Sequence, residues 1–463
     1  MKQMLANAIG NFTEIFSFRS EEAKGRVITL TSNLLTTVYN VFITGIFYTG
    51  FLTMYGMTIT DTGILMFVPF LANLFSVFSP AILSHFKRRK LVLCSAKVIY
   101  YAIYVVLITV MPQFVTDPQA RMTWFVALSF IATAFYALFS SGFTTWFYNF
   151  YPADHEQRSR FLMLMPIFSM ILSAIVLIGS GWLTDALASS PYQDQLILFF
   201  RYFAFLLAVV DVLCQSRAKE YPYRETERVT LTGVFTLPFQ QRKFLYCALL
   251  LFFWSYINNL NNGLWNYHLL NHMEFSYTLI NLVTVIQAVL LIFVMPVWKK
   301  ILRRYSWIKT FGISMLAFMP TEFIFFCMTK DTSWIYVPNC TYQHLTTAGF
   351  TLAGANVLYM NLPEENSTSY ITFHNIGVNV CAALGLLTGT WMSSIHGGDV
   401  TFPFLGLEIY AVQLTTLARG ITIAALGLLL VLKWRTFSSE KEIAEVEDRQ
   451  AAYRRMKADR KKA

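Results

Sequence analysis

The chain has 463 residues, of which 56% are hydrophobic and only 13% are charged. A soluble domain carries about 25% charged residues, so this composition excludes an ordinary water-soluble protein and indicates a membrane protein. The formal net charge of +10 would suit a nucleic-acid-binding protein, but the basic residues are distributed as in a membrane protein.

The apolar residues fall into twelve blocks, each of roughly the 20 residues that a helix needs to cross a bilayer. In chain order the blocks are 28–52, 60–84, 91–112, 122–148, 160–184, 193–215, 243–270, 276–298, 308–329, 333–360, 369–394 and 411–434. The first block is too long for a signal peptide, and no small-residue cleavage site follows it. The sequence therefore predicts an all-α polytopic membrane protein with twelve transmembrane helices.

Most of the 36 lysine and arginine residues lie in the N-terminal arm, in every second loop and in the tail. In the loops of the opposite side, the basic residues are Arg121 and Lys330. This asymmetry follows the positive-inside rule and predicts that both termini are cytoplasmic. The basic excess thus reflects topology, and no nucleic-acid partner is expected.

Two spans carry uncharged polar residues at helical spacing. In the first span these residues are Asn40, Thr44 and Tyr48, and in the seventh, within "NNLNNGLWNYHLLNH", they are Asn258, Asn259, Asn262, Trp265 and Asn266. Polar residues in membrane helices usually mark a pathway, so we predict that these eight residues bind the solute. Hydrogen bonding between packed helices is the alternative, and Asn261, at the edge of the arc, is expected to serve it.

The two halves of the sequence repeat one another. Asn40 and Gly45 recur as Asn258 and Gly263 at the same spacing of 218 residues, and "ALFSSGFTTWFYNFYP" aligns with "AGFTLAGANVLYMNLP". Matches of this kind in conserved order indicate duplication of a six-helix half. The predicted parts are an arm at 1–27, an N-terminal half at 28–215, a central loop at 216–242, a C-terminal half at 243–434 and a charged tail at 435–463.

With this 6+6 arrangement, the long central loop and the basic loops after spans two and eight, the chain resembles the major facilitator superfamily over essentially its whole length. The family's loop signature is Gly-x-x-x-Asp-Arg-x-Gly-Arg-Lys/Arg. The matching stretch here is "AILSHFKRRKLVL". Arg89 and Lys90 match the last two positions of the signature, whereas Ala81, His85, Phe86 and Arg88 replace Gly, Asp, Arg and Gly. No subfamily is assigned, and the family's Asp-based latch is not expected.

The resemblance implies rocker-switch alternating access around a central cavity lined by spans 1, 4, 7 and 10. It also implies structural or gating roles for the basic loop residues Lys87, Arg88, Arg89 and Lys90.

Five ionisable residues lie inside spans: Lys97, Arg201, Asp211, Glu322 and Arg419. Because an unpaired charge in a membrane is costly, pairing is expected. If the peripheral spans are neighbours, as in the family, the pairs are Lys97 with Asp211 and Glu322 with Arg419. Arg201 has no evident acidic partner, and an alternative role for Glu322 is proton coupling.

Three histidines could carry chemistry. His268 and His272 are one helical turn apart, a spacing that metal ligands use, but no third ligand is evident and no metal is predicted. His374, beside Asn375 in span eleven, is the other candidate for proton coupling, with ordinary packing as the alternative.

The remaining motifs carry no chemistry. The tail begins with Ser439 and Glu442 at capping-box spacing, which predicts a solvated, partly helical segment. The six cysteines show no metal or redox spacing and are expected to pack. No cofactor-binding or catalytic motif is present.

Uncharged Asn, Thr, Tyr and Trp side chains suit a neutral polar ligand. The sequence predicts a secondary active or facilitative transporter for a small polar solute that is sugar-, nucleoside- or peptide-like. It is not expected to be an enzyme. The alternatives are an exporter of lipophilic drugs or lipids on the same fold and, less favoured, a polytopic membrane enzyme. A monomer in the plasma membrane is expected, and the direction of transport and the coupling ion stay open.

Overall fold

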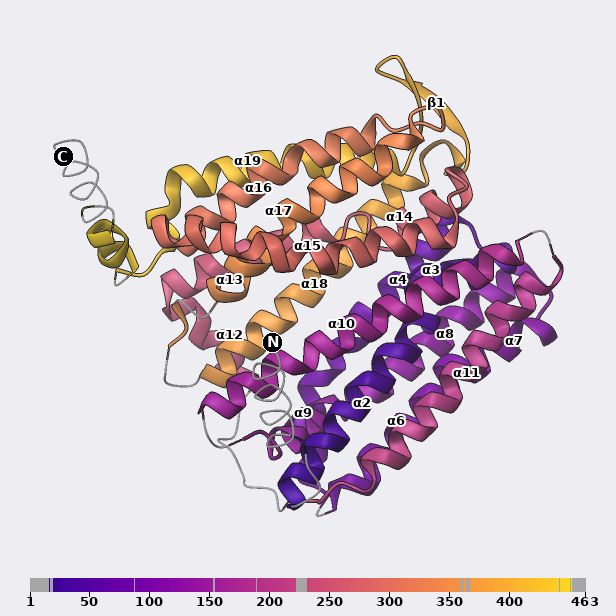
Figure 1. Cartoon of the computed structure of the whole chain (residues 1–463), viewed down its shortest axis with the longest axis horizontal. Coiled ribbons are helices and arrows are strands. Elements are labelled where there is room, and N and C mark those ends of the chain that lie inside the picture. The colour runs from indigo at the N-terminus through magenta and orange to yellow at the C-terminus, as the bar shows by residue number, and fades with distance from the viewer. Residues whose placement is uncertain are drawn as a thin grey trace, which may run out of the picture. The chain divides into compact units, whose positions relative to one another are not determined.

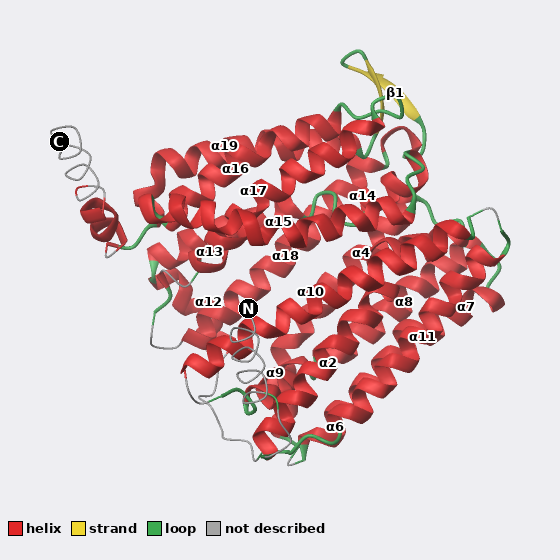
Figure 2. Ribbon diagram, viewed as in Figure 1, coloured by secondary structure: helices red, strands yellow, loops and turns green. Residues whose placement is uncertain are grey.

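The computed structural model describes residues 16, 20–86, 88–152, 155–188, 190–221, 231–358, 361–363, 367–440, 442–449 and 451. Nearly all of this part of the chain is helical, with one small hairpin (Figure 2). Within it, nine helices are long and apolar enough to cross a membrane. The chain forms two compact units: unit 1 comprises residues 1–226 and 275–282, and unit 2 comprises 227–274 and 283–463.

Unit 1 contains the first six predicted spans, several of which are built from two or three helical segments (Figure 1). The elements are α2 (Glu21–Ile43), α3 (Gly45–Met54), α4 (Ile59–Asn73), η1 (Leu74–Phe78), α5 (Ser79–Ser84), α6 (Arg89–Tyr101), η2 (Ala102–Leu107, a π-helix), α7 (Ile108–Phe114), α8 (Pro118–Ala137), α9 (Ser140–Tyr148), α10 (His155–Ala186) and α11 (Tyr192–Gln215).

Unit 2 contains the other predicted spans, although residues 277–282 at the start of α15 belong to unit 1. The helical elements are α12 (Leu231–Gln240), α13 (Arg242–Asn258), α14 (Leu264–Tyr267), η3 (His268–His272, a π-helix), α15 (Tyr277–Arg304), α16 (Trp307–Phe326), η4 (Ser333–Ile335), α17 (Tyr336–Val357), α18 (Ser367–Ser393), η6 (Ile395–Gly397) and α19 (Gln413–Phe437).

Several helices begin where a polar side chain satisfies their first free backbone N–H groups. Ser20 accepts from the backbone N–H of Ala23 at 3.1 Å and begins α2. Thr58 and Asp61 form a reciprocal capping box at the start of α4. Such side chains explain where the spans start, because the first turn of a helix has N–H groups that find no partner within the helix.

The same packing pattern occurs in both units. In unit 1, α2 packs against α10 and α11, and α6 packs against α11. In unit 2, α13 packs against α18 and α19, and α16 packs against α19. These are corresponding helices of the sequence repeat, so the duplicated sequence forms duplicated helix pairs.

Each unit has its own apolar core. Leu93, Phe143 and Phe150 belong to the core of unit 1, and Phe311 and Phe350 to that of unit 2. Large apolar side chains are also exposed on the outer faces of the helices. In α10 these include Ile167, Ile171, Ile175 and Trp182. A helix that is apolar on its exposed face as well as its buried one is typical of a protein surrounded by lipid.

The structure departs from the sequence-based prediction in two connections. No helix was predicted in the central loop 216–242, but it contains α12, an apolar helix that packs against α18. The connection before α19 was expected to be a loop, but it contains an antiparallel hairpin of β1 (Thr401–Phe404) and β2 (Leu407–Tyr410), with Thr401 opposite Tyr410. The fold is therefore helical with one small hairpin.

Candidate functional site

The two polar spans are both interrupted at the glycine that the repeat matches. In unit 1, α2 ends at Ile43 and α3 begins at Gly45, which has a φ of +57°. In unit 2, α13 ends at Asn258, a turn follows, and α14 begins after Gly263, which has a φ of +77°. Positive φ is readily adopted only by glycine, so the matched glycines allow both interruptions.

These interruptions were not expected from the sequence. The seventh span was predicted to be one continuous helix, with Asn258, Asn262 and Asn266 in line on one face. The turn at 259–263 replaces the helix there, so the helical spacing does not hold beyond Asn258. The signal that could have revealed the break is the glycine itself, which lies in a run of asparagines in the seventh span.

In unit 2 the asparagines satisfy part of the broken backbone themselves. Asn259 Nδ2 donates to the carbonyl oxygen of Ser255 at 2.8 Å, and Asn262 Nδ2 donates to Asn259 Oδ1 at 3.0 Å. Asn258 and Asn262 are exposed, whereas Asn259 and Asn266 are half-buried. The segment is thus an unwound polar stretch with carboxamides on its surface.

Trp265 adds an aromatic wall next to this stretch. The side chain is half-buried, and its ring lies 4.9 Å from that of His268 and 5.1 Å from that of Phe325.

In unit 1 the break is smaller. Thr44 ends α2 and donates to the carbonyl oxygen of Asn40 through both its backbone N–H, at 3.0 Å, and its Oγ1, at 2.7 Å. Thr44 is exposed and Asn40 is half-buried. Tyr48 was expected on the same face, but it is 3% exposed, because α3 begins a new helical register after Gly45.

Beside the break in unit 2 lies a buried ion pair. Arg419 Nη1 is 3.2 Å from Glu322 Oε1 and donates to Asn261 Oδ1 at 2.7 Å. Glu322 is completely buried, and Arg419 and Asn261 are nearly so. The expected pair is therefore present. Asn261 was expected to hydrogen-bond between packed helices, and its bond to Arg419, a partner that the sequence did not indicate, fastens the unwound turn to α19.

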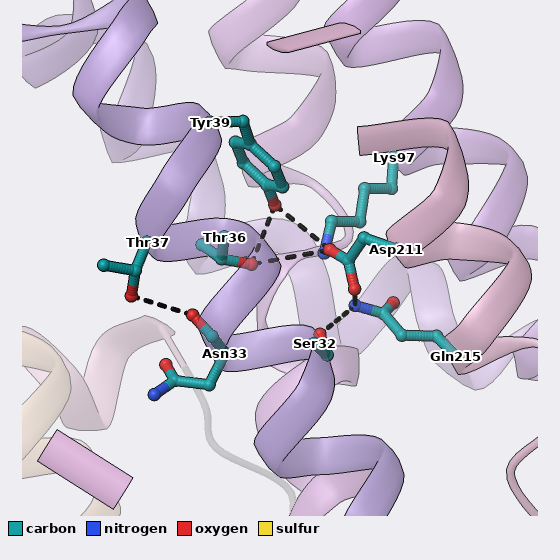
Figure 3. A network of polar contacts seen from close by, with 8 residues as sticks. All are labelled: Ser32, Asn33, Thr36, Thr37, Tyr39, Lys97, Asp211 and Gln215. Atoms are coloured by element: carbon teal, nitrogen blue, oxygen red, sulfur yellow. Dashed lines mark hydrogen bonds and ion pairs between the residues drawn. The ribbon is translucent and has the colours of Figure 1, made fainter. Parts of the chain in front are cut away.

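The second expected pair joins α6 and α11 in unit 1. Lys97 Nζ lies 2.7 Å from Asp211 Oδ2, which also accepts from the Tyr39 hydroxyl at 3.1 Å. Gln215 donates to the other carboxylate oxygen at 3.0 Å. Figure 3 shows these side chains converging from α2, α6 and α11, with Ser32 bonded to Gln215. Both carboxylate oxygens are occupied, which favours a structural role.

Arg201 is fully buried in α11 and has no ion-pair partner among the described residues. Its Nε donates to Thr109 Oγ1 at 2.6 Å, and its Nη2 donates to the carbonyl oxygen of Tyr104 at 3.2 Å. The guanidinium also lies over the rings of Phe51, at 4.1 Å, and Tyr48, at 5.5 Å. A backbone carbonyl oxygen and aromatic faces thus stabilise this cation in place of a carboxylate.

The candidates for proton coupling have different surroundings. His374 in α18 is half-buried and lies against Phe252, with ring centroids 6.0 Å apart. Glu322 is held by Arg419, as described above. His268 and His272 contact each other through their Nδ1 atoms. Across the described residues, no cluster of three or more His, Cys, Asp or Glu side chains could hold a metal ion.

The basic loop after span two is held by an acid that the sequence did not single out. Glu220 Oε1 accepts from the backbone N–H groups of Arg89 at 2.6 Å and Lys90 at 3.0 Å, at the start of α6. Lys90 Nζ donates to the carbonyl oxygen of Ala218 at 2.9 Å. Arg88 precedes α6 as its N-cap, and Lys87 lies outside the described residues.

The repeat supplies a matching acid in unit 2. Glu442 Oε1 accepts from the backbone N–H of Trp307 at 2.7 Å, at the start of α16. The capping box expected within the tail is thus only half formed: Ser439 Oγ accepts from the N–H of Glu442, but the Glu442 carboxylate binds α16. Burial raises the pKa of Glu442.

Replacing Glu220 by alanine should lower the stability of unit 1 by about 1 kcal/mol, because two N–H groups and the positive end of α6 lose their acceptor. Thermal unfolding in detergent measures the effect. The matched control is Glu440→Ala, since the Glu440 side chain is 92% exposed and its ion pair is with Lys243, which is also exposed. Equal midpoints for the two variants would contradict the assigned role of Glu220.

Comparisons with known proteins agree with this architecture. Residues 245–460 match the sequence model of the Major Facilitator Superfamily. No curated protein matches the chain significantly. The fold is similar to that of the nucleoside transporter NupG, with a TM-score of 0.61 and 13% identity over 91% of this chain and 100% of that chain.

Two other transporters have similar folds. A bacterial homologue of the human lysosomal transporter Spinster, in an inward-facing and unoccupied conformation, gives a TM-score of 0.60 at 13% identity and covers 91% of this chain and 98% of its own. A D-xylose–proton symporter gives a TM-score of 0.61 at 12% identity, and the match covers 89% of this chain and 97% of the symporter. Residues 245–460 therefore match the major facilitator superfamily in sequence, and nearly the whole chain has a fold similar to those of multi-pass membrane transporters.

Proposed function

We propose that the protein carries a small, neutral, polar solute of the sugar, nucleoside or peptide class across the membrane by rocker-switch alternating access. In this proposal all twelve apolar stretches cross the membrane and both termini are cytoplasmic. The protein acts as a monomer in the plasma membrane. The solute contacts are Asn258, Asn259, Asn262, Trp265 and Asn266 in unit 2, together with Asn40 and Thr44 in unit 1.

The observation that carries this proposal is the pair of unwound polar breaks. Irregular backbone at membrane depth is tolerated only where it is buried in protein or lines a water-filled space. Asn258 and Asn262 are exposed at the break of unit 2, so the second condition applies to them. Discontinuous helices of this kind commonly form the substrate sites of transporters.

The chemistry of the break favours a neutral solute. A carboxamide both donates and accepts hydrogen bonds, as hydroxyl- and amide-bearing solutes require. The charges nearest to the break belong to Arg419 and Glu322, which neutralise each other and are buried. Trp265 offers an aromatic face on which a sugar or base ring can stack.

Thermal-shift binding in detergent against panels of sugars, nucleosides, peptides and lipophilic cations tests the solute class. We expect stabilisation by one polar class. Asn258→Ala and Asn262→Ala should each weaken that binding by about 1 kcal/mol, or about fivefold, because each removes one hydrogen-bonding group. Uptake into proteoliposomes should fall in parallel.

Asn271→Ala is the matched control, because the Asn271 carboxamide donates to the carbonyl oxygen of Tyr267, four residues earlier in the chain, at 3.1 Å. Binding by this variant should equal that of the unmodified protein. Stabilisation by lipophilic cations alone would replace the proposal with export of drugs. Unchanged binding in both asparagine variants would remove the break from the solute path.

A further inference from the structure

Two buried histidines in unit 2 form a hydrogen-bonded chain that ends at a solvent-accessible carboxylate. His268 Nδ1 lies 3.0 Å from His272 Nδ1, and His272 Nε2 lies 2.9 Å from Asp399 Oδ1. His268 is completely buried and His272 is nearly so, whereas the Asp399 side chain is 39% exposed. The chain therefore leads from solvent into the protein interior.

The carboxylate sets the direction of the hydrogen bonds. Asp399 can only accept, so His272 donates to it through Nε2–H. In its neutral form His272 then has a lone pair on Nδ1, and His268 must donate to it through Nδ1–H. It follows that His268 Nε2 carries no proton. This atom is buried and has no hydrogen-bond partner among the described residues.

The surroundings hold both rings in place. The Tyr410 ring stacks on His272 with centroids 4.0 Å apart and planes 10° apart. Rotation of the His272 ring would break this stack. The titratable or charged groups around the pair, besides Asp399, are Tyr267, Tyr410, Lys330 and Glu274.

Lys330 is itself in an ion pair, since its Nζ lies 2.5 Å from Glu274 Oε1. This bond lowers the pKa of Glu274. The ion pair with Glu274 offsets only part of the repulsion between Lys330 and a positive charge on His272.

We propose that Asp399, His272 and His268 form a proton relay between solvent and the interior of unit 2. A proton that binds His268 Nε2 makes an imidazolium, whose Nδ1 proton passes to His272 Nδ1. The Nε2 proton of His272 passes to Asp399, which releases it to solvent. One proton enters and one leaves, and the two rings exchange tautomers. The same steps in reverse carry a proton inward and restore the first tautomers.

The inner end of the relay lies at the proposed solute site. His268 is in contact with Trp265, which follows the break in the seventh span by two residues. A charge that appears on His268 therefore arises beside a residue that contacts the solute. The relay itself does not require the proposed function. Its role in coupling transport to a proton gradient does rest on the proposed function.

The tautomers give a direct test that needs no solute. The full chain is labelled with ¹⁵N-histidine in lipid nanodiscs, and the signals are assigned with His268→Gln and His272→Gln. At neutral pH we expect a proton on Nε2 of His272 and on Nδ1 of His268. In Asp399→Asn the amide can also donate, so both rings should become tautomer mixtures. A proton on Nε2 of His268 in the unmodified protein would overturn the relay.

Glu408→Gln is the matched control for the carboxylate, because Glu408 is an exposed acid in the adjoining hairpin. It should leave the tautomers of both histidines unchanged. A merely structural role for Asp399 would alter stability without changing which ring nitrogen carries the proton.

Transport tests the coupling. Proteoliposomes loaded with a pH-sensitive dye report proton entry, and a sugar or nucleoside from the binding panel serves as the probe. In Asp399→Asn and His268→Gln, proton-driven uptake should fall by roughly a hundredfold relative to solute exchange at equal pH. The same ratio should be unchanged in Glu408→Gln.

The outcomes separate the two proposals. If no panel member is transported, the proposed function fails and the tautomers alone decide the relay. If a solute is transported with the same proton dependence in Asp399→Asn as in the unmodified protein, the relay is wrong and the proposed function stands.

Discussion

Arg419→Met should destabilise the protein by about 3–5 kcal/mol, because it leaves Glu322 as an uncompensated charge in the interior. Glu322 is completely buried and lies 3.2 Å from Arg419. The substitution also removes the donor to Asn261, which is bonded at 2.7 Å. Chemical denaturation in mixed micelles, followed by tryptophan fluorescence, measures the loss.

Two further variants identify the cause of that loss. Arg435→Met removes an arginine from the same helix, but Arg435 is 65% exposed and its pair with Glu447 should contribute less than about 1 kcal/mol. The double variant Glu322→Leu/Arg419→Met removes both buried charges and should recover most of the stability. A double variant as unstable as Arg419→Met would show that the buried charge is not the cause.

The double variant also separates stability from transport. Asn261 still lacks its partner in α19, so the unwound turn is no longer fastened at that point. We expect weaker solute binding in a protein of nearly normal stability. This result would link the ion pair to the geometry of the break.

Sequence predicts those features of the fold that the bilayer itself enforces. Backbone groups in lipid must pair internally, so long apolar blocks become helices, and charges within them must find partners. This cost predicts that such charges are paired, and the family resemblance implied the partners; the pairs Lys97–Asp211 and Glu322–Arg419 are present. Arg201 shows the limit of such prediction, because carbonyl oxygens and aromatic rings stabilise its charge without leaving any pattern in the sequence.

The candidate site was predictable in composition but not in shape. The asparagines of the seventh span were evident, yet a glycine within a helical pattern does not by itself reveal whether the helix bends, breaks or packs closely against another. The partners of the site residues are also distant in sequence. Asn261 binds Arg419, and His272 binds Asp399, so neither bond could be found from local spacing.

The close contact between α13 and α18 is the other feature on which the break depends. Gly385 faces the carbonyl group of Tyr256 in α13, and Gly389 faces that of Leu260 just after this helix. Small residues four positions apart let membrane helices approach at this distance. Leu260 belongs to the unwound turn, so Gly389 positions the break itself.

Gly389→Ala should therefore be strongly destabilising, at or above the upper end of the roughly 1–3 kcal/mol that overpacking costs. The added methyl would overlap the Leu260 carbonyl oxygen, which cannot move aside as a flexible side chain can, so α13 and α18 must separate. Because separation displaces the turn, solute binding should fall together with the unfolding midpoint.

The matched control is Gly179→Ala in α10, where a methyl group would meet nothing within 4 Å. Alanine is the better helix former, so this variant should be stabilised by about 0.5–1 kcal/mol, the opposite sign to Gly389→Ala. A loss of stability in both variants would indicate a general intolerance of substitution. Opposite signs, with binding lost only in Gly389→Ala, would show that close approach of α18 holds the unwound turn where the solute needs it.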